Sequence, residues 1–174
     1  NAPRGESIYD VGFLDELVNQ GVKCLLVVHM YGDVIISKEF CDACEKRGIM
    51  IIEDAAQSHG ASTKEGYNAG SLGLASAFSF YPGKNLGNIA DGGAIVSSSK
   101  ELVEIVRALA NYGAKEKYVH DLIGTNSRLP EISAHFLRKK LSTYDRDLKT
   151  RREQARYYMT KLDLTFTRNI RRVN

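Results

Sequence analysis

The sequence predicts an α/β fold with a mostly parallel sheet and helices on both faces. Two short apolar runs, Cys24–Val28 and Ile49–Ile52, are continuous rather than alternating, which is typical of strands buried on both faces of a parallel sheet. A segment with a helical apolar period lies between them. Such strand–helix–strand alternation favours parallel strands joined by right-handed crossovers, with all carboxyl ends at one edge of the sheet.

The totals fit a globular protein with one core. The chain has 174 residues, of which 43% are hydrophobic and 26% charged, an ordinary balance for a soluble domain. A net charge of +3 is too small to argue for nucleic acid. No apolar stretch is long enough to cross a bilayer, and no secretory signal opens the chain. Three cysteines, an odd number, do not suggest a disulfide framework, so a reducing cytoplasm is expected.

The first half of the chain alternates between helices and strands. Asp10–Gln20 is predicted to be a helix because its apolar residues share one face, and Gly21 suits the position after it. The strand Cys24–Val28 follows. Ser37 is the expected N-cap of a second helix, which ends near Gly48 and leads into the strand Ile49–Ile52.

The second half begins with a glycine-rich loop or short hairpin at 58–74. Strands are then expected at Ala75–Phe80 and Gly93–Ser97. Ser98, with Glu101 three residues later, has the spacing of a capping box for a helix that ends at Gly113.

The remainder is predicted to be an irregular polar segment followed by two helices. Residues 114–128 form the polar segment. Pro130 suits the first turn of a helix that continues through Leu141, and a charged helix follows at Asp145–Lys161. Basic residues gather there together with acidic ones, as expected of a solvated helix face.

A pair of cysteines lies inside the second predicted helix. Cys41 and Cys44 have the spacing of a metal or redox pair. A zinc site would need two more ligands at matching spacing, and a redox pair would stand at a helix N-terminus. We therefore expect buried, inert thiols and no metal site.

Lys84 is the strongest candidate for a reactive residue. It follows the predicted strand Ala75–Phe80 and a Pro-Gly turn, within a loop that also contains Gly87. A lone loop lysine is usually a solvated surface residue. At the carboxyl edge of an α/β sheet, however, a lysine can be partly desolvated and attack a carbonyl carbon.

Asp54 strengthens the interpretation of Lys84. A carboxylate at the end of an apolar strand needs a partner, which can be a structural salt bridge or a cation on a ligand. A strand-end aspartate and a loop lysine together match the needs of pyridoxal phosphate. The lysine forms a Schiff base, and the aspartate keeps the ring nitrogen protonated. Hydroxyls, backbone N–H groups and a helix N-terminus bind the phosphate.

The sequence resembles the DegT/DnrJ/EryC1/StrS family of pyridoxal-phosphate sugar aminotransferases. The resemblance extends from about Asp10 to about Leu162. The motifs that carry it, in the family's order, are His29–Gly32 (HMYG), Glu53–Gly60 (EDAAQSHG), Gly70–Gly73 (GSLG), Phe78–Gly87 (FSFYPGKNLG), Asp91–Ile95 (DGGAI), Asn111–Gly113 (NYG) and Asn126–Leu141 (NSRLPEISAHFLRKKL).

The resemblance implies an aspartate-aminotransferase-like fold, called fold type I. Residues 1–140 would belong to the large pyridoxal-phosphate-binding α/β domain, and residues 141–174 would form a linking helix and the start of a C-terminal small domain. The family's N-terminal phosphate loop and stacking aromatic residue are not found in this sequence, and the chain is expected to be incomplete at both ends.

The resemblance also implies roles for individual residues. Lys84 would form the Schiff base, Asp54 would pair with the ring nitrogen and Gln57 would lie by the ring hydroxyl. Ser79 would bind the phosphate, and Asn126 would reach the phosphate of the partner subunit's cofactor in a homodimer with shared active sites. Three further residues have weaker claims as pocket or supporting residues: His29, Tyr81 and Arg128.

The expected reaction is transfer of an amino group from an amino acid, glutamate by family analogy, to a nucleotide-linked keto sugar. Such reactions serve amino-sugar, O-antigen (lipopolysaccharide) and natural-product biosynthesis. Two alternatives stay open. Some relatives are sugar dehydratases, but these have histidine at the position of Lys84. The chain could also be a non-catalytic paralogue with a binding or regulatory role.

Overall fold

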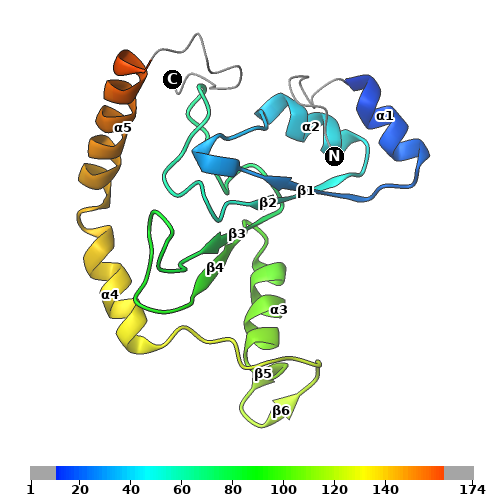
Figure 1. Ribbon diagram of the computed structural model, residues 1–174. Helices are drawn as coiled ribbons and strands as arrows, with labels where there is room; N and C mark the ends of the chain where they lie inside the picture. Colours follow the sequence, from blue (N-terminus) through cyan, green and yellow to red (C-terminus); the bar gives the residue numbers. More distant parts are fainter. Residues whose placement is uncertain (1–10, 163–174) are drawn as a thin grey trace.

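The computed structural model of the protein describes residues 11–162, except for the side chain of Val11. The predicted starts and ends that fall on 1–10 and 163–174 lie outside these residues. The described residues form a four-stranded sheet, helices packed against it, and a separate two-stranded hairpin (Figure 1).

The sheet has the strand order β1-β2-β3-β4. Strands β1 (Cys24–Val28), β2 (Met50–Asp54) and β3 (Ala75–Ser79) run parallel, and β4 (Gly93–Val96) runs antiparallel to β3. The predicted α/β class with a mostly parallel sheet is confirmed. β2 extends two residues beyond the predicted Ile49–Ile52 because Glu53 and Asp54 still pair with β1 and β3.

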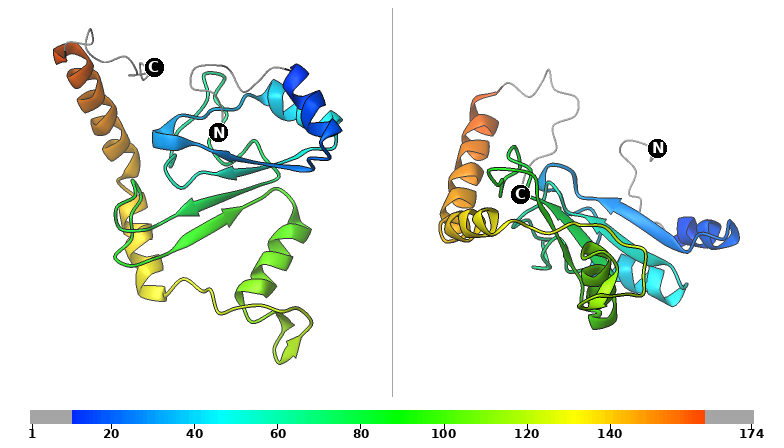
Figure 2. Two further views of the ribbon diagram at one scale, coloured as in Figure 1. Left: turned by 45° about the vertical axis from the view of Figure 1, so that its right-hand side comes forward. Right: turned by 90° about the horizontal axis from the view of Figure 1, so that it is seen from below.

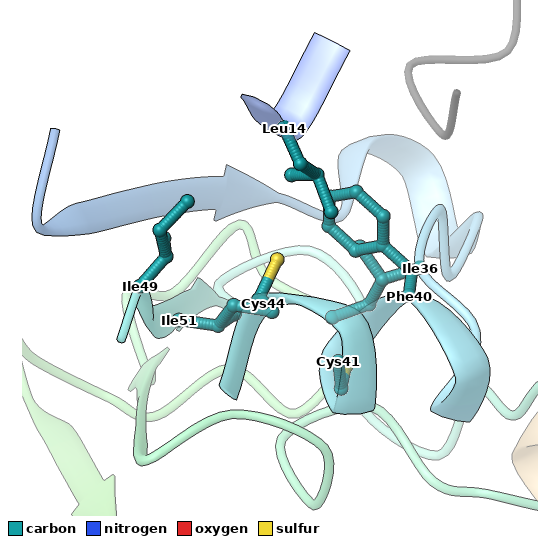
Figure 3. Packing of buried hydrophobic residues seen from close by; sticks show 7 residues of the cluster. All are labelled: Leu14, Ile36, Phe40, Cys41, Cys44, Ile49 and Ile51. Atoms are coloured by element: carbon teal, nitrogen blue, oxygen red, sulfur yellow. The ribbon is translucent and has the colours of Figure 1, made fainter. Parts of the chain in front are cut away.

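Helices α1 (Val11–Asn19) and α2 (Lys38–Lys46) cover one face of the sheet. Ser37 is the N-cap of α2 as predicted, and its hydroxyl accepts a hydrogen bond from the Phe40 N–H at 3.2 Å. Between these helices and the sheet lies the main apolar core (Figure 3). Its fully packed members are Leu14, Ile36, Phe40, Cys41, Cys44, Ile49 and Ile51.

The opposite face of the sheet is exposed at several apolar residues. The register places Leu26, Met50 and Ile95 on this face, and they are 68%, 49% and 51% exposed. The continuous apolar runs predicted strands covered on both faces. Within residues 11–162, helices α1 and α2 cover the face that carries Ile51, and the face that carries Leu26 remains accessible at these positions.

Helix α3 (Lys100–Ala110) follows β4, and a small hairpin follows the helix. The predicted cap at Ser98 is wrong by one residue: the N-cap is Ser99, whose hydroxyl accepts from the Leu102 N–H at 3.2 Å. The helix ends at Ala110, three residues before the predicted Gly113. Residues 114–128 are not wholly irregular, because β5 (Ala114–Glu116) pairs with β6 (Val119–His120).

Helices α4 (Glu131–Leu141) and α5 (Tyr144–Lys161) lie beside the loops that follow β2 and β3 (Figures 1 and 2). Pro130 is the N-cap of α4, one position before the predicted first turn, and its carbonyl accepts from the Ala134 N–H. Leu137 and Tyr144 pack on Leu86 in a second apolar cluster. None of the helices within residues 11–162 combines the length and the apolar character that crossing a bilayer requires.

Candidate active site

The carboxyl ends of the three parallel strands bring most of the predicted site residues to one edge of the sheet. Val28, Asp54 and Ala77 are register partners on β1, β2 and β3. Ser79 lies two residues beyond Ala77, and therefore on the same face of the sheet as Asp54. The loop that contains Lys84 continues from β3. This is the edge at which open α/β sheets bind ligands.

Asp54 is half-buried at the end of β2. Its Oδ1 accepts a hydrogen bond from the Ala56 N–H at 3.0 Å. No basic side chain within residues 11–162 forms an ion pair with it. The structural salt bridge considered for Asp54 is thus not formed within this part of the chain, and the carboxylate retains capacity for a cation.

Lys84 is half-buried in the loop between β3 and β4. Its backbone N–H donates to the Tyr81 carbonyl at 2.9 Å, which closes the Pro-Gly turn. Within the described residues, its Nζ makes no hydrogen bond or ion pair. Glycine is required at position 87, because a Cβ there would overlap the Pro82 carbonyl oxygen and lie 2.9 Å from the Lys84 carbonyl oxygen.

Three other predicted site residues are half-buried or exposed. Gln57 is half-buried, and its Oε1 accepts from the Tyr31 N–H at 3.2 Å. Ser79 is half-buried, and its Oγ accepts from the Tyr81 N–H at 3.2 Å, which leaves the hydroxyl proton available for donation. The side chain of Tyr81 is 57% exposed.

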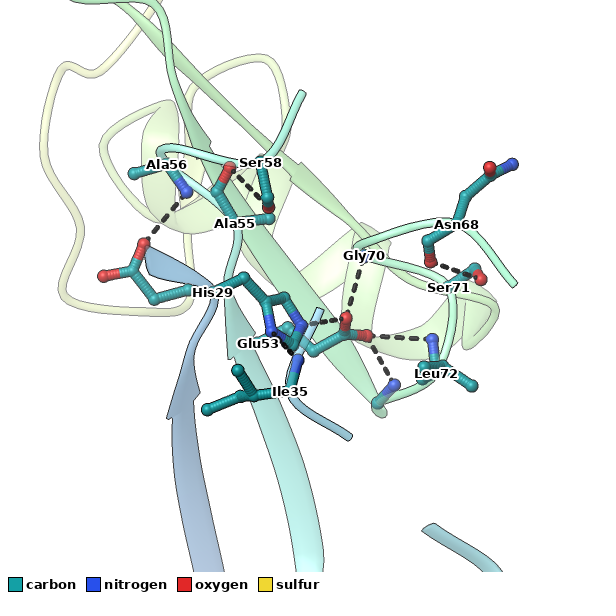
Figure 4. Close-up of polar contacts among 12 residues, drawn as sticks. His29, Ile35, Glu53, Ala55, Ala56, Ser58, Asn68, Gly70, Ser71 and Leu72 are labelled. Carbon is teal, nitrogen blue, oxygen red and sulfur yellow. Dashed lines mark hydrogen bonds and ion pairs between the residues drawn. The ribbon is translucent and has the colours of Figure 1, made fainter. Parts of the chain in front are cut away.

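His29 lies behind this edge rather than at its surface. It is fully buried, and its Nε2 is 2.8 Å from Glu53 Oε2, while its Nδ1 is 3.4 Å from the donating Ile35 N–H (Figure 4). Both ring nitrogens are therefore engaged by protein groups. This placement suits the supporting role expected for His29 better than the role of a pocket residue.

Glu53 is the functional candidate that the sequence did not single out. Its carboxylate is fully buried and also accepts from the N–H groups of Gly70, Leu72 and Gly73 at 2.7, 2.8 and 2.6 Å. Burial by itself raises the pKa of Glu53, but these bonds and the His29 hydrogen bond outweigh it, so the pKa lies below its ordinary value. The sequence signal that could have identified Glu53 is a carboxylate at a strand position that faces the core.

His59 is another buried polar residue near the site. It lies 5.4 Å from the Phe78 ring and 6.0 Å from the Phe80 ring, and neither of its ring nitrogens has a hydrogen-bond partner within the described chain. Burial is the main cause that lowers the pKa of His59. The backbone of Ser79 raises this pKa, and the positive charge of Lys84 lowers it. A neutral imidazole is therefore favoured beside the lysine.

Asn126 and Arg128 lie beside the end of α3, next to Asn111 and Tyr112. Asn126 forms a bridge with Asn111, and its Oδ1 accepts from Arg128 Nε at 2.9 Å. Both side chains are exposed. Within residues 11–162, no hydrogen bond or ion pair joins either residue to Asp54, Lys84 or Ser79.

The residues at the edge fit pyridoxal phosphate in their chemistry. An amine on Lys84 and a carboxylate on Asp54 both lack ion-pair partners among residues 11–162. Those are the two groups that the aldehyde and the ring nitrogen of this cofactor require. The Ser79 hydroxyl adds a donor for a phosphate oxygen.

Comparisons with known proteins show which family the chain resembles. The profile of the DegT/DnrJ/EryC1/StrS aminotransferase family matches residues 7–170. A Streptomyces venezuelae dTDP-3-amino-3,4,6-trideoxy-alpha-D-glucose transaminase is 43% identical over 132 residues, covering 76% of this chain and 35% of its own length. The Saccharopolyspora erythraea erythromycin biosynthesis sensory transduction protein EryC1 is 40% identical, covering 92% of this chain and 44% of its own length.

A solved structure adds the same relationship in three dimensions. S. venezuelae DesV in complex with a ketimine intermediate superimposes with a TM-score of 0.79 at 40% identity, covering 88% of this chain and 41% of DesV. The chain spans less than half the length of each of these three relatives. Since the family profile covers nearly the whole sequence, the chain belongs to the DegT/DnrJ/EryC1/StrS aminotransferase family.

Proposed function

We propose that the protein is a pyridoxal-phosphate-dependent aminotransferase that moves an amino group from an amino acid to a nucleotide-linked keto sugar. The observation that carries the proposal is that Asp54 ends β2, the Lys84 loop follows the neighbouring parallel strand β3, and neither side chain has an ion-pair partner in residues 11–162. Relatives named as dTDP-sugar and UDP-sugar aminotransferases support the substrate class.

Each residue would have a separate task. Pyridoxal phosphate, when bound, supplies an electron-withdrawing ring. Lys84 Nζ would hold the cofactor covalently and, once released, would move a proton from the α-carbon of the amino donor. Asp54 would keep a proton on the ring nitrogen. Gln57 would orient the ring hydroxyl, and the Ser79 hydroxyl would bind a phosphate oxygen.

The remaining predicted residues fit a shared site between two copies of the chain. Asn126 and Arg128 are exposed, and within residues 11–162 neither forms a hydrogen bond or ion pair with Asp54, Lys84 or Ser79. We propose that the protein is a homodimer in which Asn126 reaches the phosphate at the partner's site, with Arg128 beside it. Tyr81, exposed on the Lys84 loop, would border the sugar substrate. Residues 141–174 would link this domain to a C-terminal small domain.

The biological setting follows from the substrate class. The amino donor would be glutamate, and the amino-sugar product would enter a polysaccharide, such as the O-antigen of lipopolysaccharide, or a glycosylated natural product. Nucleotide-linked sugars are made in the cytoplasm, where we place the enzyme. These statements rest on the family and on the names of relatives.

A regulatory function is the second candidate, and one observation favours it. EryC1, the relative that covers 92% of this chain, is named a sensory transduction protein. A purely regulatory paralogue would have no need of an unpaired lysine at the carboxyl edge. The lysine also separates the chain from dehydratase relatives, which we expect to have histidine there. We therefore favour catalysis.

The test is chemical labelling of the full-length protein. After addition of pyridoxal phosphate and reduction with borohydride, mass spectrometry should find a pyridoxyl group on Lys84. Lys84→Ala should remove the label and reduce amino transfer to background. Lys64→Ala, a change at an exposed loop lysine, should leave both unchanged. Absence of cofactor absorbance and of label on Lys84 would defeat the proposal in favour of the regulatory one.

A further inference from the structure

The Glu53 carboxylate joins three segments at the carboxyl edge of the sheet. It stands on β2, hydrogen bonds to His29 directly after β1, and accepts three N–H groups of the 70–73 turn (Figure 4). Removing a carboxylate from water is costly, and apolar residues of similar volume usually stabilise a core at least as well. A buried charge with four donors therefore indicates a requirement for a defined geometry.

One chain of contacts leads from Glu53 to Gln57. The His29 ring is hydrogen-bonded to Glu53, and His29 directly precedes the turn η1 (Met30–Gly32). Within this turn Tyr31 has φ of 56°, a left-handed conformation that non-glycine residues rarely adopt and that needs support from its surroundings. The Tyr31 N–H then donates to Gln57 Oε1 at 3.2 Å. The orientation of the Gln57 amide thus depends on the placement of the turn.

A second chain of contacts leads to Asp54. Asp54 follows Glu53 on β2, and neighbouring residues of a strand point to opposite faces. The His29 N–H donates to the Asp54 carbonyl at 3.0 Å. His29 therefore contacts two successive residues of β2. Its ring is hydrogen-bonded to the Glu53 carboxylate, and its backbone N–H is hydrogen-bonded to the Asp54 carbonyl.

We propose that Glu53 and His29 form a buried positioning pair that sets the orientation of Gln57 and Asp54 in the candidate site. Neither residue needs to touch substrate or cofactor. The inference rests on the proposed function in naming pyridoxal phosphate as the ligand that Gln57 and Asp54 meet. The dependence of the 29–32 turn on Glu53 is independent of that identity.

The hydrogen-bond pattern predicts that glutamine cannot replace Glu53 without the loss of a hydrogen bond. Each carboxylate oxygen accepts two donors: Oε1 from Leu72 and Gly73, and Oε2 from His29 and Gly70. A glutamine amide would present an NH₂ group at one of these places, where it would face a backbone N–H. At least one buried donor would lose its acceptor, and the segment it belongs to would shift.

The experiment compares three variants of the full-length protein: Glu53→Gln, His29→Leu and the control Glu65→Gln. His29→Leu leaves Glu53 its three backbone donors and removes the link from Glu53 to the 29–32 turn, together with the acceptor of the Ile35 N–H. Glu65 is exposed in the same loop region, and its change removes the same charge without touching the pair. Hydrogen exchange of the apo-protein is followed at Tyr31, and the affinity and pH profile of pyridoxal phosphate absorption are measured.

We expect faster Tyr31 exchange and cofactor affinity about tenfold or more weaker in Glu53→Gln and His29→Leu, in line with the loss of residues that orient ligand-binding groups. The pH midpoint of the cofactor's absorption should shift, since it reports the charges around the ring. Glu65→Gln should match the wild type. Folded variants with unchanged exchange, affinity and midpoint would overturn the inference.

The outcomes separate the two proposals. A wild type that is not labelled on Lys84 defeats the aminotransferase proposal, and the exchange at Tyr31 alone then decides the positioning role. If Glu53→Gln does not fold, His29→Leu decides it. Loss of thermal stability with unchanged Tyr31 exchange and cofactor binding would mean that the pair serves the core only, which also overturns the inference.

Discussion

Single residues at the candidate site are constrained by the space around them, and Gly87 is the sharpest case. A Cβ at this position would overlap the Pro82 carbonyl oxygen, so Gly87→Ala must shift the backbone of the Lys84 loop. We expect a loss of about 1–3 kcal/mol in the free energy of unfolding, together with weaker labelling of Lys84. Urea unfolding and the borohydride assay measure the two effects.

The matched control is Gly83→Ala in the same loop. Its Cβ would meet only the side chain of Tyr81, at 3.4 Å. If Gly83→Ala and Gly87→Ala behaved alike, the close approach at Gly87 would not be what shapes the loop around Lys84.

His59 makes stability depend on pH. Burial lowers its pKa, and the unfolded chain has the ordinary value of about 6.5. Between these two pKa values the unfolded state binds a proton that the folded state does not. Stability therefore rises with pH across this window and falls as the pH drops below about 6.5. Urea midpoints measured from about pH 5 to 7.5 should show this slope, and His59→Phe should flatten it.

His135→Gln serves as the control for His59, because His135 is exposed on α4. It should keep the slope of the wild type. An unchanged slope in His59→Phe would mean that another group carries the pH dependence.

The sequence offered candidates for the reactive residues of the site but not for the residues that support them. Asp54 and Lys84 stand out in the sequence as candidates because one follows an apolar strand and the other lies in a glycine-rich loop, and their roles stay a prediction. Glu53 could not, because three of its four partners are backbone N–H groups 17 to 20 positions away. Any residue type supplies such a donor, so no pattern of side chains reveals it.

At the scale of elements, local chemistry decided which predictions succeeded. β1 has the predicted bounds because Cys24–Val28 is continuously apolar. The strand β5 is three residues of mixed polarity and β6 only two, so neither shows a strand period, and their pairing depends on the turn between them. The N-cap of α3 was misplaced by one residue because Ser98 and Ser99 are chemically equal candidates.

Helices α4 and α5 hold the loops on either side of β3 in place. The Tyr144 hydroxyl donates to the His59 carbonyl at 3.0 Å, and Lys140 Nζ donates to the Gly87 carbonyl at 2.8 Å. Tyr144→Phe keeps the ring in its apolar cluster but leaves a buried carbonyl without its donor. We expect a loss of about 1–2 kcal/mol in the free energy of unfolding, measured by urea titration.

Tyr157→Phe is the control for the tyrosine hydroxyl, since Tyr157 lies on the same helix and its side chain is 61% exposed. It should leave the urea midpoint unchanged. Equal effects of the two substitutions would show that the bond from Tyr144 to the 58–60 loop does not stabilise the fold.

The predicted division of the chain after residue 140 stays a prediction, although Leu137 and Tyr144 pack in one cluster across it.

At the scale of the whole molecule, the open face of the sheet governs how the 174-residue chain should behave by itself. Leu26, Met50 and Ile95 expose apolar surface on one continuous face. Contiguous apolar patches on soluble proteins promote association. We therefore expect the isolated chain to bind the dye ANS and to self-associate, as measured by fluorescence and analytical ultracentrifugation. Leu26→Lys with Met50→Lys should reduce both signals. Ile123→Lys is the matched control, because Ile123 is 100% exposed but lies in the loop after β6. If Ile123→Lys lowered dye binding and association as much as the paired sheet substitutions, total apolar exposure, and not the sheet face, would be responsible.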